Sequence, residues 1–403
     1  MQEENFIVRE PLLNTQERVL GYQIRWQRPA GENEAGAAGM LSLARFVAEQ
    51  LNETESGALL GEHILFLPAT PALLADDAFR QLPPKGTVLA ISVADAAAPE
   101  AVAAVQAMRA RGYGISLRDV HPANADAGLL AHATHIEVPA GAPDFAARTE
   151  GYRALNLPSL HVVACQVDNW HDYDSCAALG LYAFVGNLHL TRRPGSLSRD
   201  LNPAQALILQ LMDMVRKNAD VKQLESVLKR DAALSYKLLR YINSAGFGLG
   251  CEIQSLRHAV TMLGYSPLYR WLALLLATAT TTGYSPVLMQ TAVIRGRFAE
   301  LLGQTFLPRN EAENLFVAGM FSLLDKLLGV PMEDVLEKIQ LSEPVTQALL
   351  SREGIYGPFL ALAEACELHS SDVDAMATSL CIGARQVNQA HLSALSWAQN
   401  LAL

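Results

Sequence analysis

The sequence predicts two parts of different fold class, an α/β N-terminal half and an all-α C-terminal half. As far as about residue 190, short runs rich in β-branched and aromatic residues alternate with alanine-rich runs of helical period. Beyond that point the apolar pattern is helical throughout. Residues 191–198, between the two patterns, contain Pro and Gly and break the periodicity. We therefore expect a first domain over residues 1–193, a linker over 194–203 and a helical domain over 204–403.

The first half is expected to begin with a hairpin, because residues 14–17 are turn-like and lie between two β-rich runs. Runs such as ILFL, VLAISV and VVACQV are apolar on both faces, which is typical of a buried parallel sheet. The expected strands are 6–9, 19–26, 63–67, 88–93, 114–118, 135–138, 160–167 and 182–185. The expected helices are 40–51, 71–81, 99–111, 125–132, 144–155 and 170–179. Six or more β–α repeats fit a (β/α) barrel or a doubly wound sheet. The half is short for a full barrel, so some units should be trimmed.

The second half has the start and stop signals of a compact helical bundle. Asn202 and Pro203 are typical of a helix start, and Asp231 and Ser255 are expected to cap two later helices. Asn and Gly at residues 243–246 are expected to end the first of these two helices in a glycine-rich elbow. The expected helices are 204–218, 221–229, 232–243, 256–263, 267–278, 286–302, 311–328, 332–339, 344–351, 358–367 and 372–391.

Composition excludes several classes of protein. The 403 residues are 50% hydrophobic and 18% charged, enough apolar material for two or three buried cores. A formal net charge of −10 disfavours nucleic acid or an anionic membrane as a partner. The five cysteines are widely spaced and never form C-x-x-C, which is typical of reduced thiols. With no signal-peptide core and no apolar run near the ~20 residues of a spanning helix, we expect a soluble cytoplasmic protein without membrane insertion.

Several phrases of the first half carry a resemblance to a known family. They are GYQIRWQ, TVLAISV, RGYGISLRDV, THIEV, HVVACQVD and LGLYAFVGNLHLTRRP. In their order they resemble the EAL family of bacterial cyclic di-GMP phosphodiesterases, over roughly residues 6–194. The resemblance implies a shortened TIM-like (β/α) barrel whose chemistry stands at the carboxyl ends of the strands.

The positions that match the EAL metal site carry other groups in this chain. An intact EAL enzyme resembles a two-metal hydrolase, in which carboxylates, an Asn and a Lys surround cations that activate water. Here Gln23 stands for the first Glu, Leu67 or Pro68 for the Asn, Ala90 for the next Glu, Arg118 for the first Asp of a pair, Glu137 for the Lys and Cys165 for a further Glu. Only Asp119 matches the family. Since divalent cations of this kind prefer oxygen ligands, we expect no catalytic residue, no metal and no cofactor.

The phrase DAALSYKLLRYINSAGFGLGCEIQSLRHAVTMLGYSPLYRWL, at residues 231–272, closely resembles the HDOD family. The likeness extends over about residues 201–403. It implies a helical plan like that of the HD phosphohydrolases, without their metal-binding residues. In AGMFSLLDKLLG, Ser322 and Leu323 stand where those enzymes have the His-Asp pair, and neither side chain can ligate a cation.

Three short motifs have catalytic alternatives that we weigh against structural ones. The glycines at 246–250 approach G-x-G-x-x-G, but no strand precedes them, so a helix-ending elbow is favoured. His171-Asp172 lacks a companion histidine at metal-ligand spacing. Cys165 and His161 lie four apart on one strand, where a buried cysteine is favoured over a nucleophile.

Polar side chains around the elbow suggest a surface for a protein partner. Lys237, Arg240, Arg257 and His258 fall off the apolar stripes of their helices, and Asn243 ends the first of them. These five are the candidate partner-binding residues, and a solvated helix face is the alternative.

The expected function is that of a non-catalytic bacterial signalling adaptor, a degenerate EAL barrel coupled to an HDOD protein-interaction module. A second hypothesis is a cyclic di-GMP receptor without turnover, in which Arg25, Arg28 and Arg118 meet phosphates. An active metal-dependent phosphodiesterase is the third.

Overall fold

The structure, a computed structural model, divides into two units. It describes residues 5–27, 36–53, 63–96, 98–124, 127–191, 203–243, 252–278, 286–328, 331–338, 341–368 and 370–401. One unit comprises Glu3–Pro194 with the short Glu367–Ser371, and the other comprises Gly195–Cys366 and Asp372–Leu403 together with Met1–Gln2. Residues 192–202, which hold most of the expected linker, and the elbow residues 244–251 lie outside the described residues.

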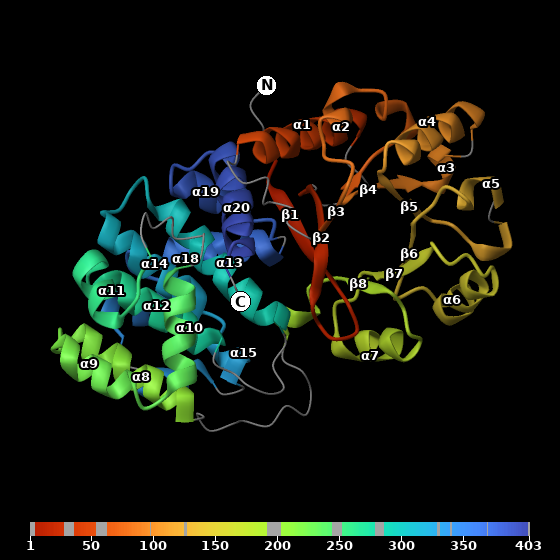
Figure 1. Cartoon of the computed structure of the whole chain (residues 1–403). Coiled ribbons are helices and arrows are strands. Elements are labelled where there is room, and N and C mark those ends of the chain that lie inside the picture. The colour runs from red at the N-terminus through yellow and green to blue at the C-terminus, as the bar shows by residue number, and fades with distance from the viewer. Residues whose placement is uncertain are drawn as a thin grey trace. The chain divides into compact units, whose positions relative to one another are not determined.

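The first unit is a closed barrel of eight strands (Figure 1). β1 runs antiparallel to both β2 and β8, and every other neighbouring pair is parallel. The strands are β1 Ile7–Leu13, β2 Val19–Trp26, β3 Ile64–Pro68, β4 Thr87–Ser92, β5 Gly114–Arg118, β6 His135–Pro139, β7 His161–Cys165 and β8 Ala183–Val185. The barrel confirms the predicted fold and decides against the doubly wound sheet.

The barrel is shortened where helices are reduced to turns, as predicted. A hairpin joins β1 to β2, and its turn is held by Asn14, whose Oδ1 accepts from the backbone N of Gln16 and of Arg18. The longer helices are α1 Ala37–Glu53, α4 Pro99–Ala110, α6 Phe145–Ala154 and α7 Trp170–Ala178. The four-residue helices are α2 Asp77–Arg80, α3 Val93–Ala96 and α5 Ala127–Leu130.

The single helix predicted over residues 71–81 is wrong. A 3-10 turn at Pro71–Leu73 precedes α2, which starts afresh because the Asp76 side chain accepts from the N of Ala78. An Asp side chain that caps a new helix in this way ends the preceding turn.

Aromatic rings and histidines fill the barrel at the amino ends of β6 and β7. The His135 ring lies edge-on to Phe66, with centroids 5.1 Å apart, and 5.5 Å from the ring of His161, which stacks on Tyr182 at 4.1 Å. His135 is 5% exposed, and a 2.9 Å hydrogen bond joins its Nδ1 to Thr134 Oγ1. Burial, with smaller contributions from the His161 and Arg109 charges, lowers the pKa of His135 to about 3.

We expect this histidine to make the barrel sensitive to mild acid. Below the ordinary His pKa of about 6.5 the unfolded chain takes up a proton that the folded chain does not bind until about pH 3. The free energy of unfolding therefore falls as pH falls through this window, by about 2 kcal/mol between pH 6.5 and 5. In urea unfolding at a series of pH values, His135→Phe should lose most of this slope, whereas exposed His171→Phe should keep it. An unchanged slope in His135→Phe would contradict the assignment.

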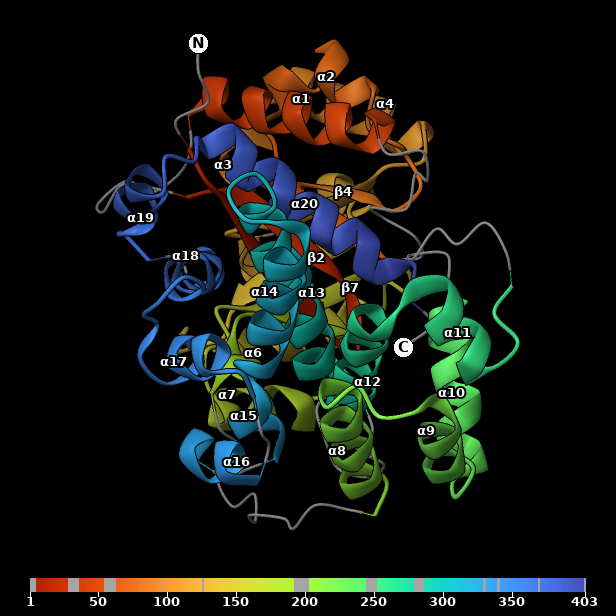
Figure 2. The same ribbon diagram turned by 90° about the vertical axis from the view of Figure 1, so that its left-hand side faces the viewer.

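The second unit is entirely helical in the part that the structure describes (Figure 2). α13 packs against both α14 and α20, and α12 packs against α8 and α14. The helices are α8 Pro203–Arg216, α9 Val221–Leu228, α10 Ala232–Ile242, α11 Leu256–Leu263, α12 Tyr265–Thr278, α13 Pro286–Gly303, α14 Arg309–Phe321, α15 Leu324–Leu328, α16 Met332–Lys338, α17 Glu343–Ser351, α18 Gly357–Leu368, α19 Val373–Ser379 and α20 Ala384–Gln399. The caps predicted at Asp231 and Ser255 are confirmed: their side chains accept from the N of Leu234 and of His258.

Two helices predicted as continuous are each broken in two. The helix predicted over 311–328 stops after Phe321, where the Ser322 hydroxyl donates to the Gly319 carbonyl and competes with the helical ladder. The helix predicted over 372–391 stops after Ser379, because Cys381 adopts the left-handed conformation at φ 56°. α20 then starts at Ala384 and runs to Gln399.

α13 and α14 cross at two facing glycines. A Cβ added to Gly296 would lie 2.7 Å from the Phe316 carbonyl oxygen, and one added to Gly319 would lie 2.8 Å from both the Arg295 oxygen and the Gly296 Cα. Since these neighbours are backbone atoms, no side-chain rotation can make room. The two glycines set how closely the central helices approach.

None of the helices described is both long and apolar enough to cross a lipid bilayer. The cysteines that the structure describes, Cys165, Cys176, Cys366 and Cys381, form no disulfide bond, and Cys251 lies outside the described residues.

Candidate functional site

The barrel mouth, at the carboxyl ends of the parallel strands, brings several of the predicted positions together. Gln23 donates from Nε2 to Glu137 Oε2 across the barrel, at 3.3 Å. Ser116, two residues before Arg118 on β5, donates to the other carboxylate oxygen, Oε1, at 2.7 Å. Side chains on a strand alternate, so these bonds put Gln23, Arg118, Glu137 and Cys165 on the inner face.

Glu137 is the buried acidic group of the mouth, 5% exposed. Burial raises the pKa of its carboxyl, and the nearby Arg118 charge and the two hydrogen bonds pull it partly back. Both carboxylate oxygens already accept hydrogen bonds from the protein. The group is therefore held in place by Gln23 and Ser116.

Arg25 and Cys165 complete the mouth. The Arg25 guanidinium lies 3.0 Å from Glu10 Oε2, and Glu10 pairs with Gln23 in the β1–β2 register. Burial, and then the charges of Glu137 and Glu10, raise the pKa of the Cys165 thiol far above its ordinary value. A raised pKa keeps such a thiol protonated and lowers its reactivity as a nucleophile. His161, its candidate base, lies at the other end of β7, about 13 Å away at the usual rise per residue of a strand.

The two remaining predicted positions at the mouth are Ala90 and Asp119. Ala90 is buried on β4, 2% exposed, and offers only a methyl group. Asp119 is exposed after β5, in the left-handed conformation at φ 59°, and its charge acts on both Glu137 and Cys165. Within the described ranges no group of three or more His, Cys, Asp or Glu residues could hold a metal ion.

His171-Asp172 belongs to the start of α7. Asn169 Oδ1 accepts from the N of Asp172, and Asn169 Nδ2 donates to Asp172 Oδ2 at 2.7 Å. These bonds are those of a helix cap, which gives Asp172 a structural role that the sequence did not predict.

In the helical unit, Ser322 and Leu323 lie in the break between α14 and α15. Leu323 is core, 1% exposed. Ser322 Oγ accepts from Nη1 of Arg295 at 2.8 Å, and the same guanidinium, 4% exposed, pairs with Glu364 at 3.0 Å. Arg352 holds Glu364 from its other side at 2.7 Å. Where HD hydrolases are expected to hold a cation, this chain has a buried guanidinium and its counter-ion.

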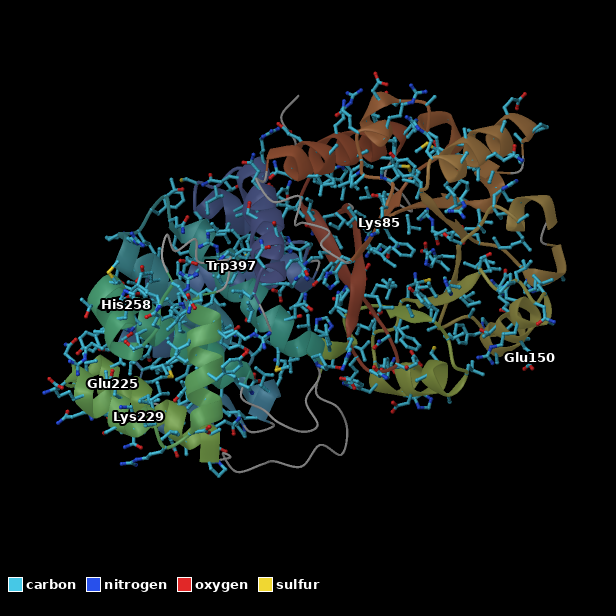
Figure 3. All side chains as sticks on the ribbon, viewed as in Figure 1. Lys85, Glu150, Glu225, Lys229, His258 and Trp397 are labelled. Atoms are coloured by element: carbon cyan, nitrogen blue, oxygen red, sulfur yellow. The ribbon has the colours of Figure 1, made fainter. Side chains whose placement is uncertain are left out.

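Four of the five candidate partner-binding residues lie on α10 and α11, and Asn243 caps the end of α10; their role in binding stays a prediction. Lys237 and Arg240 are exposed on α10, and Arg257 is exposed on α11, with its guanidinium 4.0 Å from Glu225 on α9. His258 and Glu225 lie at the outer edge of the unit (Figure 3). The exposed Tyr236 (67%) and Met262 (57%) are on the same two helices.

Asn243 has a structural task within this surface. Its Nδ2 donates to the Ile253 carbonyl at 2.8 Å, and its Oδ1 accepts from the Ile253 N at 2.7 Å. This clamp ties the end of α10 to the approach to α11, and it is independent of any partner.

A cluster that sequence reasoning missed lies among α12, α13, α14 and α20. Arg270, Arg297 and Glu300 form ion pairs there beside a cavity. Arg270 lies in residues 265–278, an otherwise uncharged and mainly apolar stretch that predicts a buried helix. A single charge in such a stretch was the available sign of a buried ion pair.

The fold defines a two-part protein, a closed barrel followed along the chain by a helical domain. Residues 201–343 match the HDOD domain family, so the helical unit contains an HDOD domain. This confirms the predicted HDOD resemblance.

Two curated proteins are similar to nearly the whole chain. The uncharacterized protein YuxH of Bacillus subtilis is 23% identical over 406 residues, covering 98% of each chain. The cyclic di-GMP phosphodiesterase CdgJ of Vibrio cholerae is 24% identical over 414 residues, covering 98% of this chain and 93% of that one.

Among solved structures, the N-terminal half resembles EAL domains. The EAL domain of Mycobacterium smegmatis DcpA is 16% identical, covering 45% of this chain and 90% of that one, with a TM-score of 0.33. Klebsiella pneumoniae BlrP1, in a manganese and cyclic di-GMP complex, is 16% identical, covering 46% of this chain and 55% of that one, with a TM-score of 0.35.

Proposed function

We propose that this chain is a non-catalytic signalling adaptor, in which the barrel senses or docks and the HDOD domain engages a protein partner. The observation that carries the proposal is the state of Glu137, whose two oxygens are held by Gln23 and Ser116 beside the Arg118 charge. A guanidinium and a protonated thiol stand where the EAL resemblance puts metal-holding carboxylates. Loss of one ligand-supporting group costs about 10–100-fold in affinity or activity, and here several ligands are replaced at once.

The HDOD domain supports the same conclusion. Where the HD resemblance puts a histidine ligand, Ser322 accepts a hydrogen bond from Arg295, which is paired with Glu364. The exposed Tyr236 and Met262 beside Lys237 and Arg257 give α10 and α11 a mixed apolar and basic surface of the kind that protein partners bind.

The name of CdgJ favours the opposite reading, an active phosphodiesterase. At 24% identity, individual site residues are free to differ, and the substituted positions at the barrel mouth decide our preference. The test is hydrolysis of cyclic di-GMP by the purified full chain with Mg²⁺ or Mn²⁺, with CdgJ assayed in parallel. We expect no turnover above buffer. Turnover that disappears in Asp119→Ala would refute the non-catalytic proposal.

A cyclic di-GMP receptor without turnover is the second candidate. Arg118 at the mouth favours it, because guanidinium groups bind phosphates in bidentate geometry. Against it, Arg25 is already paired with Glu10, and Arg28 lies outside the described residues. Calorimetry with cyclic di-GMP separates the two candidates. Binding heat that saturates at micromolar nucleotide and is lost in Arg118→Gln would support a receptor. No binding heat at tens of micromolar nucleotide would rule out the receptor and favour the adaptor.

A further inference from the structure

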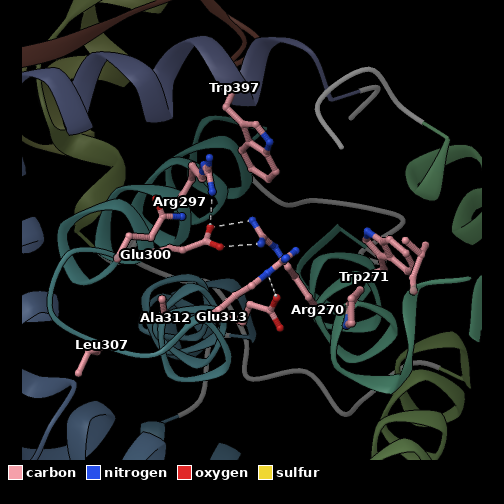
Figure 4. A pocket seen from close by; sticks show the side chains of 12 residues that line it. Arg270, Trp271, Arg297, Glu300, Leu307, Ala312, Glu313 and Trp397 are labelled. Atoms are coloured by element: carbon pink, nitrogen blue, oxygen red, sulfur yellow. Dashed lines mark hydrogen bonds and ion pairs between the residues drawn. The ribbon is translucent and has the colours of Figure 1, made fainter. Parts of the chain in front are cut away.

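The helical unit has a cavity of its own, lined from α12, α13, α14 and α20 (Figure 4). Its volume is about 480 Å³, within the range of small-molecule sites. The apolar part of the lining comes from Leu263, Pro267, Leu307 and Ala312, and Trp271 and Trp397 line the cavity as well. A phosphate ion alone would leave most of this volume empty.

Two guanidinium groups are fixed at the cavity. Arg270 meets Glu300 with both terminal nitrogens, at 2.7 and 2.8 Å, and Arg297 meets the same carboxylate at 2.8 Å. The Arg270 side chain is 13% exposed and the Glu300 side chain 4%. Since Glu300 already fixes both cations, a ligand would not have to order them, which lowers the cost of binding.

Aromatic rings hold the two cations from the other side. The Arg270 guanidinium carbon lies 4.1 Å from the Phe316 ring centroid and 5.5 Å from that of Trp397, and the Arg297 carbon lies 5.5 Å from Trp397. Planar guanidinium groups in this setting also stack against the flat rings of ligands.

The charged residues that line the cavity favour the binding of an anion. Glu300 is shared by two arginines, and Glu313 is taken by Arg309 at 3.3 Å and by the Ser266 hydroxyl. The lining thus has three arginines against two glutamates. The buried Nε of Arg297 has no hydrogen-bond partner among the described residues.

The cavity is distinct from the position of the missing His-Asp pair. Glu313 and Ser322 are nine residues apart along α14 and its end, about 13 Å at the helical rise per residue. Arg295, which contacts Ser322, and Arg297, which lines the cavity, are two residues apart on α13 and so point in nearly opposite directions.

We propose that this cavity binds a small organic anion, a phosphate or carboxylate group joined to a flat ring. The anionic group meets Arg297 and Arg270, and the ring lies against the apolar and indole lining. Binding there gives the HDOD domain a chemical input of its own, whether or not the barrel binds a nucleotide.

The test is calorimetry on the full chain with four probes used separately: adenosine 5′-monophosphate, benzoate, adenosine and inorganic phosphate. Saturable binding of adenosine 5′-monophosphate would identify a phosphate ligand, and saturable binding of benzoate would identify a carboxylate ligand. Adenosine and inorganic phosphate, each carrying half of the recognised chemistry, should bind at least about tenfold more weakly, the worth of one charge-assisted contact. No binding of either ring-bearing anion overturns the proposal.

Substitutions of a lining arginine, compared with one outside the cavity, test whether binding takes place in the cavity. Arg297→Gln should weaken it about tenfold or more, and Arg297→Lys, which keeps the charge, should retain part of it. Glu300 keeps its bidentate partner Arg270 in both variants, so the fold should survive. Arg230→Gln removes an exposed arginine that does not line the cavity and should leave binding unchanged. Equal affinity in Arg297→Gln and the parent chain overturns the proposal.

Discussion

Glu364→Ala should lower the free energy of unfolding of the helical unit by about 3–5 kcal/mol, because it leaves a buried guanidinium without its carboxylate. Arg295 is 4% exposed, and its Nη1 lies 3.0 Å from Glu364 Oε1. The same substitution releases Arg352, whose side chain also donates to the Ala348 carbonyl at the end of α17. Urea unfolding of the full chain, followed by the circular dichroism of the helices, measures the loss.

Two further variants bracket this prediction. Glu364→Gln keeps oxygen and nitrogen in place but removes the charge, so its loss should be smaller than that of Glu364→Ala. Glu353→Ala removes an exposed carboxylate that accepts from the Ser351 hydroxyl, and it should cost less than about 0.5 kcal/mol. A Glu364→Ala chain as stable as Glu353→Ala would contradict the importance of the buried pair.

Gly319→Val should destabilise the helical unit by about 3 kcal/mol, since overpacking a close helix crossing forces backbone shifts. The added Cβ would stand 2.8 Å from the Arg295 oxygen and from the Gly296 Cα, both on the facing helix α13. Hydrogen exchange of α13 and α14 amides, together with the thermal midpoint, would report the separation of the two helices.

Gly319→Ala provides a graded comparison. Alanine favours a helix over glycine by about 1 kcal/mol, which offsets part of the clash, so its loss should be smaller than that of valine. At Gly383, where an added Cβ meets nothing within 4 Å, alanine should cost less than about 1 kcal/mol, through the cap alone. Equal effects at Gly319 and Gly383 would show that the crossing is not tightly packed.

Most of the fold could be predicted because its local signals agree with its tertiary structure. The barrel strands are apolar on both faces, and β5 was predicted with its observed bounds, Gly114–Arg118. α11 was also predicted with its observed bounds, Leu256–Leu263, since a serine cap and a terminal glycine mark them. The sequence did not predict the breaks at Asp76, Ser322 and Cys381, where a side-chain hydrogen bond or a left-handed residue interrupts a continuous helical pattern.

The candidate sites divide in the same way. The altered mouth positions could be named from the sequence, but their mutual contacts could not: Gln23 and Glu137 are 114 residues apart and meet only across the closed barrel. The charged cavity escaped detection for the same reason. Arg270 and Glu300 are 30 residues apart, and nothing local to either predicts the other.

The Arg295 guanidinium affects whether the stability of the HDOD domain depends on the metal ions in solution. A hydrolase that relies on a bound metal gains stability by mass action and loses it when the free metal falls. Here the positive charge beside Ser322 is covalently part of the chain, and its counter-charge is another side chain, Glu364. A chelator cannot remove this charge, so the stability of this part of the domain should not change when the free metal concentration falls.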